Sequence, residues 1–260
     1  MKVSQLLPSV RVEVEKPFEE KLARAKQLIK MFANKNACVS CSFGKDSTVA
    51  LWLALEENPK IPVIFNNTGV EFKETLALKV QMTESFGLNL METYPEKTWF
   101  QVWEGFKLPD GWKHNAKETR DRCCYYLKEK PFKLLVKQCK FQQNFTGLTA
   151  IESRQRQLRI CELGTYYYNK TNNLWRIHPL AFWTPEEVWQ FIHDNHIPEN
   201  LAYKKYGIDR IGCVPCTAHH KWREQLAKVN PRLYKFISER YFHQRLLDVS
   251  EPQQKETTKQ

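Results

Sequence analysis

Three short apolar runs, each followed by a longer helix-like segment, dominate the first third of the chain. The runs cover residues 36–40, 61–65 and 88–92, and helical patterns occupy residues 48–57 and 71–86 between them. Strands that alternate with helices of this length are typical of a parallel sheet with helices on both faces. The sequence therefore predicts an α/β protein with a doubly wound, mostly parallel sheet.

The remaining segments extend this pattern on both sides. Apolar residues recur every three or four positions from Phe18 to Phe32, which predicts a helix. A further strand is expected near 144–148 and a hairpin over 166–177. Thr184 precedes Pro185 and Glu187, a strong signal for a helix start. We expect an N-terminal helical arm (1–36), a central α/β domain (37–217), and a C-terminal helix with a polar tail (218–260).

Composition excludes several classes of protein. The chain of 260 residues is 42% hydrophobic, which is enough for a packed core and excludes global disorder. No apolar run approaches the roughly 20 residues that span a bilayer. The first residues lack the apolar core of a signal peptide. We therefore expect a soluble, cytoplasmic protein with no membrane partner, in which the eight cysteines are not a disulfide set.

The positive charge is concentrated in one stretch. The whole chain has a net charge of +11, and residues 113–159 alone contribute +8, from 12 Lys or Arg against four acids. Such a field attracts phosphate-rich partners, either a nucleotide or a nucleic-acid backbone. A solvated helix face would look the same in the sequence, so charge alone does not decide between these interpretations.

A short polar loop, 42–47, lies between the first predicted strand and its helix. Open α/β sheets bind ligands at this position, outside the carboxyl ends of the strands. Gly44 permits close approach of the backbone, Lys45 offers a positive charge, and Asp46 could orient the loop or bind Mg²⁺. The spacing differs from that of a Walker A loop. An ordinary strand–helix connection contains the same residue types, so this interpretation stays open.

Four cysteines form the strongest metal-binding pattern. Cys123 and Cys124 are adjacent, and Cys213 and Cys216 form a C-x-x-C. Four thiolates satisfy a 4Fe–4S cluster, and a tetrahedral zinc site is the alternative. The second C-x-x-C, Cys38 and Cys41, falls on a predicted strand, where residues three apart point to opposite faces. We interpret these two as buried, and the isolated Cys139 and Cys161 as plain thiols or persulfide carriers.

These motifs together resemble a known superfamily. The S-x-G-K-D-S sequence at 42–47 resembles the pyrophosphate loop of the adenine nucleotide α-hydrolases, or N-type ATP pyrophosphatases. The segment 179–217, ending in I-G-C-V-P-C-T, is similar to the APS/PAPS (sulfonucleotide) reductase family. The segment 147–156 resembles a family motif usually written G-L-R-x-x-E/Q-S-x-x-R. The resemblance spans roughly residues 37–217 and implies that this α/β domain binds a nucleotide and a cluster.

The resemblance implies functional roles for specific residues. It implies catalytic roles for Lys45 and Asp46, and a 4Fe–4S cluster on the four cysteines above, with ATP and Mg²⁺ as the other cofactors. The implied nucleotide-binding residues are Ser42, Phe43, Gly44, Lys45, Asp46, Ser47, Asn67, Thr68, Gly69, Gly147, Arg154 and Arg156. Arg154 and Arg156 could hold phosphate or sulfate in a bidentate manner.

Two departures from the reductase pattern shape the functional hypothesis. Thr149 stands where the family has its first arginine, and no cysteine follows Cys216, although the reductases use a nucleophilic cysteine in a C-terminal segment. We therefore expect an enzyme that adenylates a nucleic-acid acceptor for sulfur transfer. It resembles the cluster-bearing component of DNA phosphorothioation systems, and we rank DNA phosphorothioation before tRNA thiolation. An APS or PAPS reductase and a non-catalytic nucleotide- and cluster-binding subunit are the alternatives. The expected partners are an adenine nucleotide, DNA or tRNA, a cysteine desulfurase as sulfur donor, and a second copy in a homodimer.

Overall fold

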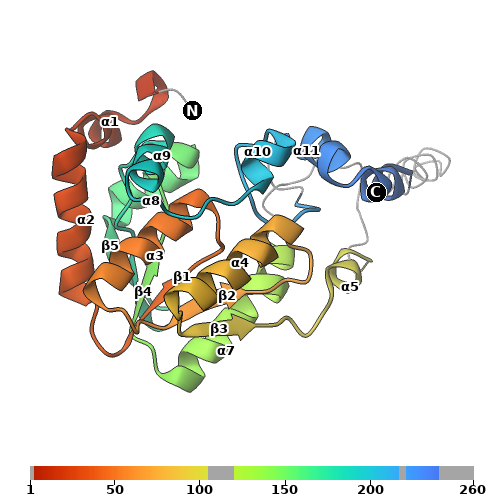
Figure 1. The fold of residues 1–260 in the computed structure, drawn as a ribbon, viewed down its shortest axis with the longest axis horizontal. Helices are drawn as coiled ribbons and strands as arrows, with labels where there is room; N and C mark the ends of the chain where they lie inside the picture. Colours follow the sequence, from red (N-terminus) through yellow and green to blue (C-terminus); the bar gives the residue numbers. More distant parts are fainter. Residues whose placement is uncertain (1–2, 105–119, 217–220, 240–260) are drawn as a thin grey trace, which may run out of the picture.

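The computed structural model describes residues 3–104, 120–216 and 221–239, and Figure 1 shows their arrangement. Lys113 and Lys117 of the basic stretch, and the predicted polar tail from residue 240, lie outside the described residues. The strands are β1 (Ala37–Ser40), β2 (Val63–Asn66), β3 (Leu90–Thr93), β4 (Gln143–Thr146), β5 (Tyr166–Asn169) and β6 (Leu174–Ile177). The first helices are η1 (Val3–Gln5), α1 (Pro8–Val14), α2 (Phe18–Phe32), α3 (Lys45–Glu57), α4 (Lys73–Phe86) and α5 (Trp99–Glu104). The later helices are η2 (Arg120–Glu129), α7 (Lys130–Cys139), η3 (Ala150–Glu152), α8 (Arg154–Leu163), α9 (Pro185–Asp194), α10 (Ala202–Tyr206) and α11 (Trp222–Val229).

The described strands form one six-stranded sheet in the order β3-β2-β1-β4-β6-β5. All neighbouring strands are parallel except β5, which pairs antiparallel with β6 in the expected hairpin. After β1 the chain adds β2 and β3 on one side, and later adds β4 on the other. The predicted α/β fold with a mostly parallel sheet is confirmed, and the reversal of strand order lies between β1 and β4.

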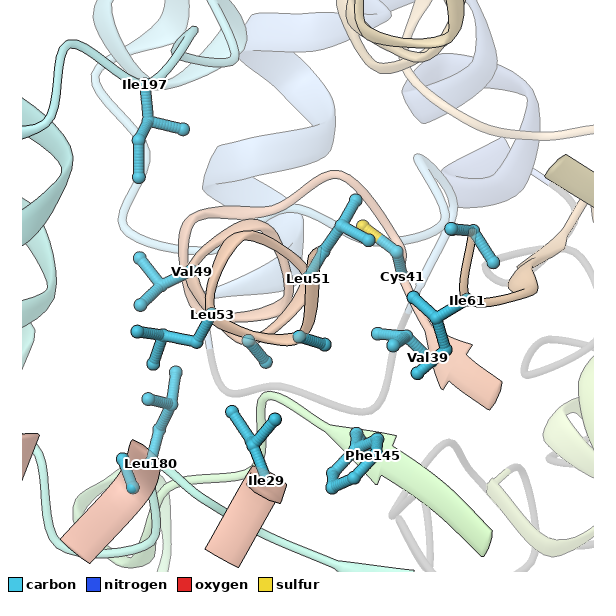
Figure 2. Packing of buried hydrophobic residues seen from close by; sticks show 14 of the residues in the cluster. Ile29, Val39, Cys41, Val49, Leu51, Leu53, Ile61, Phe145, Leu180 and Ile197 are labelled. Carbon is cyan, nitrogen blue, oxygen red and sulfur yellow. The ribbon is translucent and has the colours of Figure 1, made fainter. Parts of the chain in front are cut away.

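Helices cover both faces of the sheet because side chains alternate along each strand. Val39, Phe65 and Phe145 face the largest apolar cluster, where α2, α3, α4 and α9 pack, and Figure 2 shows part of it. Cys38 and Ile64 point to the opposite face, where Phe132 and Val136 of α7 cover them. The short strands are therefore buried on both sides.

The segments that flank the sheet are explained by local sequence. Ala25 and Ile29 of α2 belong to the same apolar cluster as α3. At α9, the Thr184 side chain accepts a hydrogen bond from the Glu187 backbone N–H, and the Glu187 side chain accepts one from the Thr184 N–H, as the sequence predicts. In the described part of the chain, no helix combines the length and apolarity that a membrane crossing requires.

One end of the sheet carries the segments that matter for function. The chain leaves β3 at its carboxyl end and continues into α5, and Figure 1 shows α10 and α11 on the same side of the molecule. An antiparallel bridge between Glu71 and Cys213 joins the loop after β2 to the segment after α10. The loops that follow the parallel strands therefore meet the C-terminal helices there.

Candidate functional site

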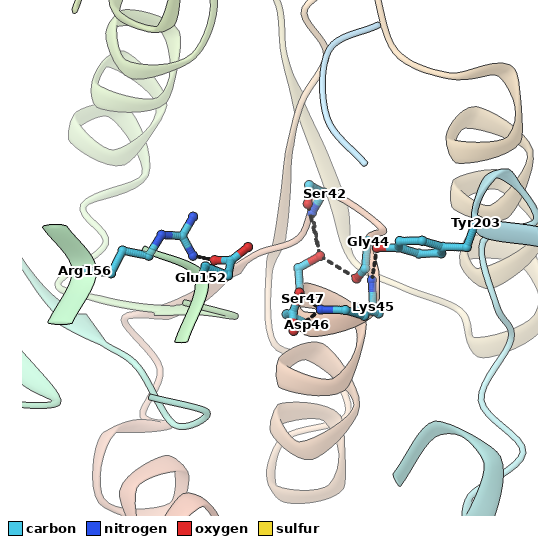
Figure 3. Close-up of polar contacts among 8 residues, drawn as sticks. All are labelled: Ser42, Gly44, Lys45, Asp46, Ser47, Glu152, Arg156 and Tyr203. Atoms are coloured by element: carbon cyan, nitrogen blue, oxygen red, sulfur yellow. Dashed lines mark hydrogen bonds and ion pairs between the residues drawn. The ribbon is translucent and has the colours of Figure 1, made fainter. Parts of the chain in front are cut away.

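The loop 42–47 lies at the point where the strand order reverses. It follows β1, which pairs with β2 on one side and β4 on the other, and it begins α3. In open parallel sheets this is where a crevice forms between diverging connections. Figure 3 shows the loop, with Arg156 on one side and Tyr203 on the other. The predicted phosphate loop thus occupies the position that binds ligands in such folds.

Ser47 holds the loop in a compact form. Its hydroxyl donates to the Gly44 carbonyl oxygen at 3.0 Å and accepts from the Ser42 backbone N–H at 3.2 Å. The Ser42 and Ser47 hydroxyls lie 3.1 Å apart. These contacts link residues on both sides of the turn, so the loop is ordered before any ligand arrives.

Phe43 attaches the loop to the apolar core. Its φ of 53° is in the left-handed region, which is unfavourable for a bulky residue. Its ring is buried and packs edge-on against Phe65 at 5.6 Å between ring centroids. The Asn200 side-chain amide donates to the Phe43 carbonyl oxygen at 3.0 Å. Burial and this hydrogen bond offset the backbone cost, so Phe43 shapes the loop and its side chain is not free to contact a nucleotide.

Lys45 and Asp46, the predicted catalytic pair, form an ion pair at the start of α3. The Lys45 Nζ lies 2.7 Å from both carboxylate oxygens of Asp46, and both side chains are largely shielded from solvent. Mg²⁺ is commonly held by one or two carboxylates together with substrate phosphates. Asp46 is a carboxylate in that position, so the residues present fit a magnesium ion bound jointly with a nucleotide.

Gly147 directly follows β4 and packs against the loop. A Cβ at this position would lie only 2.4 Å from the Asp46 carbonyl carbon and 2.5 Å from the Ser47 nitrogen. The glycine therefore allows the end of β4 to pack directly on the first turn of α3. Gly147 therefore contacts the loop, and its predicted role in nucleotide binding stays a prediction.

The structure separates the two predicted arginines of α8. Arg156 forms an ion pair with Glu152, and its guanidinium is close enough to Asp46 and Arg210 for both to affect its pKa. Burial and Arg210 together lower the pKa of Arg156 to about 10. Arg154 is exposed at the first position of α8. Arg156 is thus the arginine beside the loop, and Arg210 is a second cation that the sequence interpretation missed.

Tyr203 was also missed. Its hydroxyl accepts a hydrogen bond from the Lys45 backbone N–H at 2.9 Å, although the two residues are 158 positions apart. Its aromatic ring packs edge-on against Trp189 at 5.1 Å. No local pattern in the sequence indicates such a contact, because it depends on the path of the chain between α9 and α10.

The Asn67–Thr68–Gly69 turn faces the cysteines. Thr68 is buried, and its backbone N–H and hydroxyl both donate to the Glu71 carboxylate. The Thr68 hydroxyl also lies 3.4 Å from the Cys213 sulfur. The side-chain oxygen of Asn67 accepts from the Gly69 N–H at 3.1 Å, which stabilises the left-handed conformation of Gly69. This turn supports the segment of Cys213.

The four predicted metal-ligand cysteines come from two segments that lie together. Cys123 and Cys124 are on η2, a π-helical segment, while Cys213 pairs with Glu71 and Cys216 follows it in a tight turn. Burial, followed by the influence of the other thiols, raises the pKa of Cys123 to about 12. Burial is also the main cause that raises the pKa of Cys124, to about 11.

The donor set fits an iron–sulfur cluster. Within the described ranges, no three His, Cys, Asp or Glu side chains converge closely enough for a single metal ion. Cys213 and Cys216 nevertheless both raise the pKa of Cys123 and of Cys124, so the two pairs lie near each other, and a cubane cluster spaces its thiolates more widely than one ion does. Cys213 is the largest influence that raises the pKa of Lys128, to which it is also hydrogen-bonded. That positive charge would offset the negative charge of a thiolate-bound cluster.

His178 follows β6 at the same edge of the sheet. Its ring is buried, and its Nδ1 lies 2.7 Å from the Thr146 hydroxyl. Burial, with positive charge from Arg176 and Arg156, lowers its pKa to about 3. The imidazole is therefore neutral at ordinary pH.

The fold and these residues define a nucleotide-binding α/β protein, in which the loop 42–47 follows β1 and the segment of Cys213 pairs with the loop after β2, both at the carboxyl ends of parallel strands. The family model of the phosphoadenosine phosphosulfate reductase domain matches residues 36–219. The chain belongs to this family of nucleotide-utilising enzymes, within the adenine nucleotide α-hydrolase superfamily, as the sequence motifs predict.

Individual relatives agree with this assignment. An uncharacterized protein of Methanocaldococcus jannaschii is 29% identical over 221 residues, which cover 84% of this chain but only half of that protein. An adenosine 5'-phosphosulfate reductase of Bacillus cytotoxicus is 31% identical over 187 residues, covering 71% of this chain and 74% of the reductase. The crystal structure of the phosphoadenylyl-sulfate reductase of Candida auris in its phosphate complex has the same fold, with a TM-score of 0.56, 17% identity and coverage of 75% and 93%.

Proposed function

We propose that this protein is an ATP pyrophosphatase-type enzyme that adenylates a nucleic-acid acceptor for sulfur transfer, with DNA phosphorothioation ahead of tRNA thiolation. One observation carries the proposal. The segment from Tyr203 to Cys216 contacts the phosphate loop at Lys45, brings Arg210 near Arg156, and ends at two of the four cysteines. A nucleotide on the loop would therefore share this segment with the thiols.

The loop residues suit an adenylyl transfer. An oxygen of the acceptor attacks the α-phosphorus of ATP, the bond between the α-phosphorus and the bridging oxygen breaks, and pyrophosphate leaves. Lys45 and Arg156 would stabilise the charge that develops on the leaving group. Asp46 would hold Mg²⁺ with the phosphates. A sulfur nucleophile then displaces AMP from the activated acceptor.

The cysteine group would serve the second half of the reaction. Cys123, Cys124, Cys213 and Cys216 would hold a 4Fe–4S cluster, which would supply a metal centre that orients the sulfur donor. The basic stretch, whose described part includes Lys130, Lys133 and Lys137, suits a nucleic-acid backbone. A cysteine desulfurase would supply the sulfur as a persulfide, whose outer sulfur displaces AMP. A thiol reductant would then cleave the S–S bond of the adduct, which releases the donor thiol and leaves the sulfur on the acceptor. Two copies of the chain would form a homodimer.

A sulfonucleotide reductase is the second candidate, favoured by the similarity to the Bacillus cytotoxicus enzyme. That reaction needs a nucleophilic thiol near the nucleotide. Cys41 is buried beneath the loop, and burial raises its pKa to about 11. Cys139 packs under the opposite face of the sheet, and Cys161 contacts Ser9 at the N-terminal helix. The positions of these three thiols favour the sulfur-transfer proposal.

The two candidates differ in their products. The full chain, purified without oxygen and assayed for iron, is incubated with ATP and DNA or tRNA, and pyrophosphate is followed. It is incubated separately with APS or PAPS and a thiol reductant, and sulfite is followed. Pyrophosphate release that depends on nucleic acid supports the proposal, whereas thiol-dependent sulfite release supports the reductase. Binding of ATP with neither product identifies a non-catalytic nucleotide-binding subunit and overturns both.

Asp46→Asn tests the role of the loop. The substitution keeps the size of the side chain but removes the charge that pairs with Lys45 and would bind Mg²⁺. We expect pyrophosphate release to fall at least about 100-fold, as is common when a group that stabilises the transition state is lost, with unchanged iron content. Asp194→Asn, at the exposed end of α9, is the matched control. Equal turnover of the two variants would refute the role given to Asp46.

A further inference from the structure

The first turn of α3 presents backbone N–H groups, which are the usual donors to a phosphate at a helix N-terminus. One of them is already occupied. The Lys45 N–H donates to the Tyr203 hydroxyl oxygen at 2.9 Å, and Figure 3 shows the ring of Tyr203 directed at the loop. Because the Lys45 N–H is engaged, a phosphate on this loop would contact the Tyr203 hydroxyl instead of that backbone donor.

Gly44 makes room for this hydroxyl. Its φ of −88° and ψ of 160° are extended values that any residue adopts, so backbone conformation does not require glycine here. A Cβ at this position would lie 3.2 Å from the Tyr203 Oη, which is tighter than an ordinary contact. The glycine of the loop therefore allows the close approach of a side chain from α10.

The hydroxyl retains a donor when it accepts from Lys45. A phenol has one O–H donor as well as its acceptor lone pairs. Burial raises the pKa of Tyr203, and Asp46 acts in the same direction, so the group keeps its proton. The edge-on contact with Trp189 fixes the ring. The O–H is thus available to a ligand at the helix N-terminus.

We propose that Tyr203 is a phosphate-binding residue of this site, whose hydroxyl accepts from the Lys45 amide and donates to a phosphate oxygen of the bound nucleotide. The phosphate loop would then be completed by a residue that is distant in sequence. The assignment rests on the proposed function in taking the loop as a nucleotide phosphate site, but it does not depend on which nucleotide reacts. Gly44 and Tyr203 act as a pair in this proposal.

The test compares ligands with and without phosphate. Binding of ATP, APS, PAPS, inorganic pyrophosphate and adenosine to the full chain is measured for the wild type, Tyr203→Phe, Gly44→Ala and the double variant. Tyr206→Phe is the control, because Tyr206 is on the same helix but its hydroxyl donates to Glu74. Thermal unfolding of each variant verifies that it is folded.

We expect Tyr203→Phe to weaken ATP and pyrophosphate binding about tenfold or more, since a hydrogen bond to a charged group is worth at least the free energy of a tenfold change. Adenosine binding should change less than about twofold on the same basis. Gly44→Ala should cause a similar loss, because its methyl group would displace the hydroxyl. In the double variant the loss should not exceed that of Tyr203→Phe alone, since the phenylalanine ring carries no hydroxyl to displace.

Other outcomes overturn the assignment. If Tyr203→Phe binds ATP with the same affinity as the control, the proposed hydrogen bond to phosphate is refuted. An equal loss for adenosine would indicate a purely structural role, and additive losses in the double variant would separate Gly44 from Tyr203. If the wild type binds APS or PAPS and not ATP, the proposed function fails, and a tenfold loss of that binding in Tyr203→Phe still supports the role of Tyr203. Failure of every phosphate-bearing ligand to bind the wild type would overturn both proposals.

Discussion

Substitution of Gly147 by alanine should disrupt the packing of the end of β4 against the phosphate loop. The added Cβ would lie 2.4–2.5 Å from the carbonyl carbon and oxygen of Asp46 and the nitrogen of Ser47. Carbon atoms in contact normally stay about 3.5–4.0 Å apart. Because all three atoms belong to the backbone, no side-chain rotation relieves the contact, and the end of β4 and the start of α3 must separate by about 1 Å.

The cost can be estimated from overpacking. Inserting a methyl group into a well-packed site costs about 1–3 kcal/mol, and a clash with backbone places Gly147→Ala in the upper part of that range. For a chain of this size, about 2–3 kcal/mol corresponds to a fall in Tm of roughly 4–12 °C. The same shift misplaces the Lys45–Asp46 turn, so ATP affinity should fall too.

Calorimetric unfolding and ATP titration of the same samples measure both effects. Gly212→Ala is the control, because among the described residues no atom beyond its two chain neighbours lies within 4 Å of its added Cβ, and its φ is outside the left-handed region. The control should stay within about 0.5 kcal/mol of the wild type. A Gly147→Ala protein with the wild-type Tm and ATP affinity would refute the close packing of β4 against the loop.

Three further predictions concern stability and the metal centre. The pKa of His178 is about 3 in the folded chain and about 6.5 in the unfolded chain, so the unfolded state binds more protons between these values. The free energy of unfolding should therefore fall as the pH drops from 6.5 towards 3, by up to about 1.4 kcal/mol per pH unit. His178→Asn should flatten this slope in urea unfolding measured across that range. Thr184→Ala removes half of the capping box of α9 and should lower the free energy of unfolding by about 1 kcal/mol, whereas Thr171→Ala in the exposed hairpin turn should have no measurable effect. Cys213→Ala should lose most of the bound iron in anaerobically purified protein, and Cys161→Ala should retain it; equal iron content would contradict the four-cysteine centre.

Local patterns predicted the elements of the sheet. Apolar runs such as 61–65 contain the information for a strand, because burial on both faces requires continuous apolar residues. The capping box at Thr184 and the opposite directions of Cys38 and Cys41 followed equally from local geometry. Each of these features depends on residues only a few positions apart, which explains why the sequence sufficed.

The site was predicted only in part, for two physical reasons. Arg154 and Arg156 are two positions apart on a helix, so their side chains point about 160° away from each other around the helix axis, and only one of them lies beside the loop. Tyr203 and Arg210 reach the loop through tertiary packing, for which the sequence carries no periodic signal. The roles of the individual nucleotide-binding and cysteine residues stay predictions.

The burial of β1 and of its end on both faces of the sheet also separates the thiols of the chain by their chemical accessibility. Cys38 and Cys41 are 0% and 2% exposed on opposite faces of the sheet, so an alkylating reagent reaches them only after unfolding. Cys161 is exposed and should react at once. Alkylation followed by mass spectrometry can therefore distinguish native from unfolded chains by two internal reporters, without an added label.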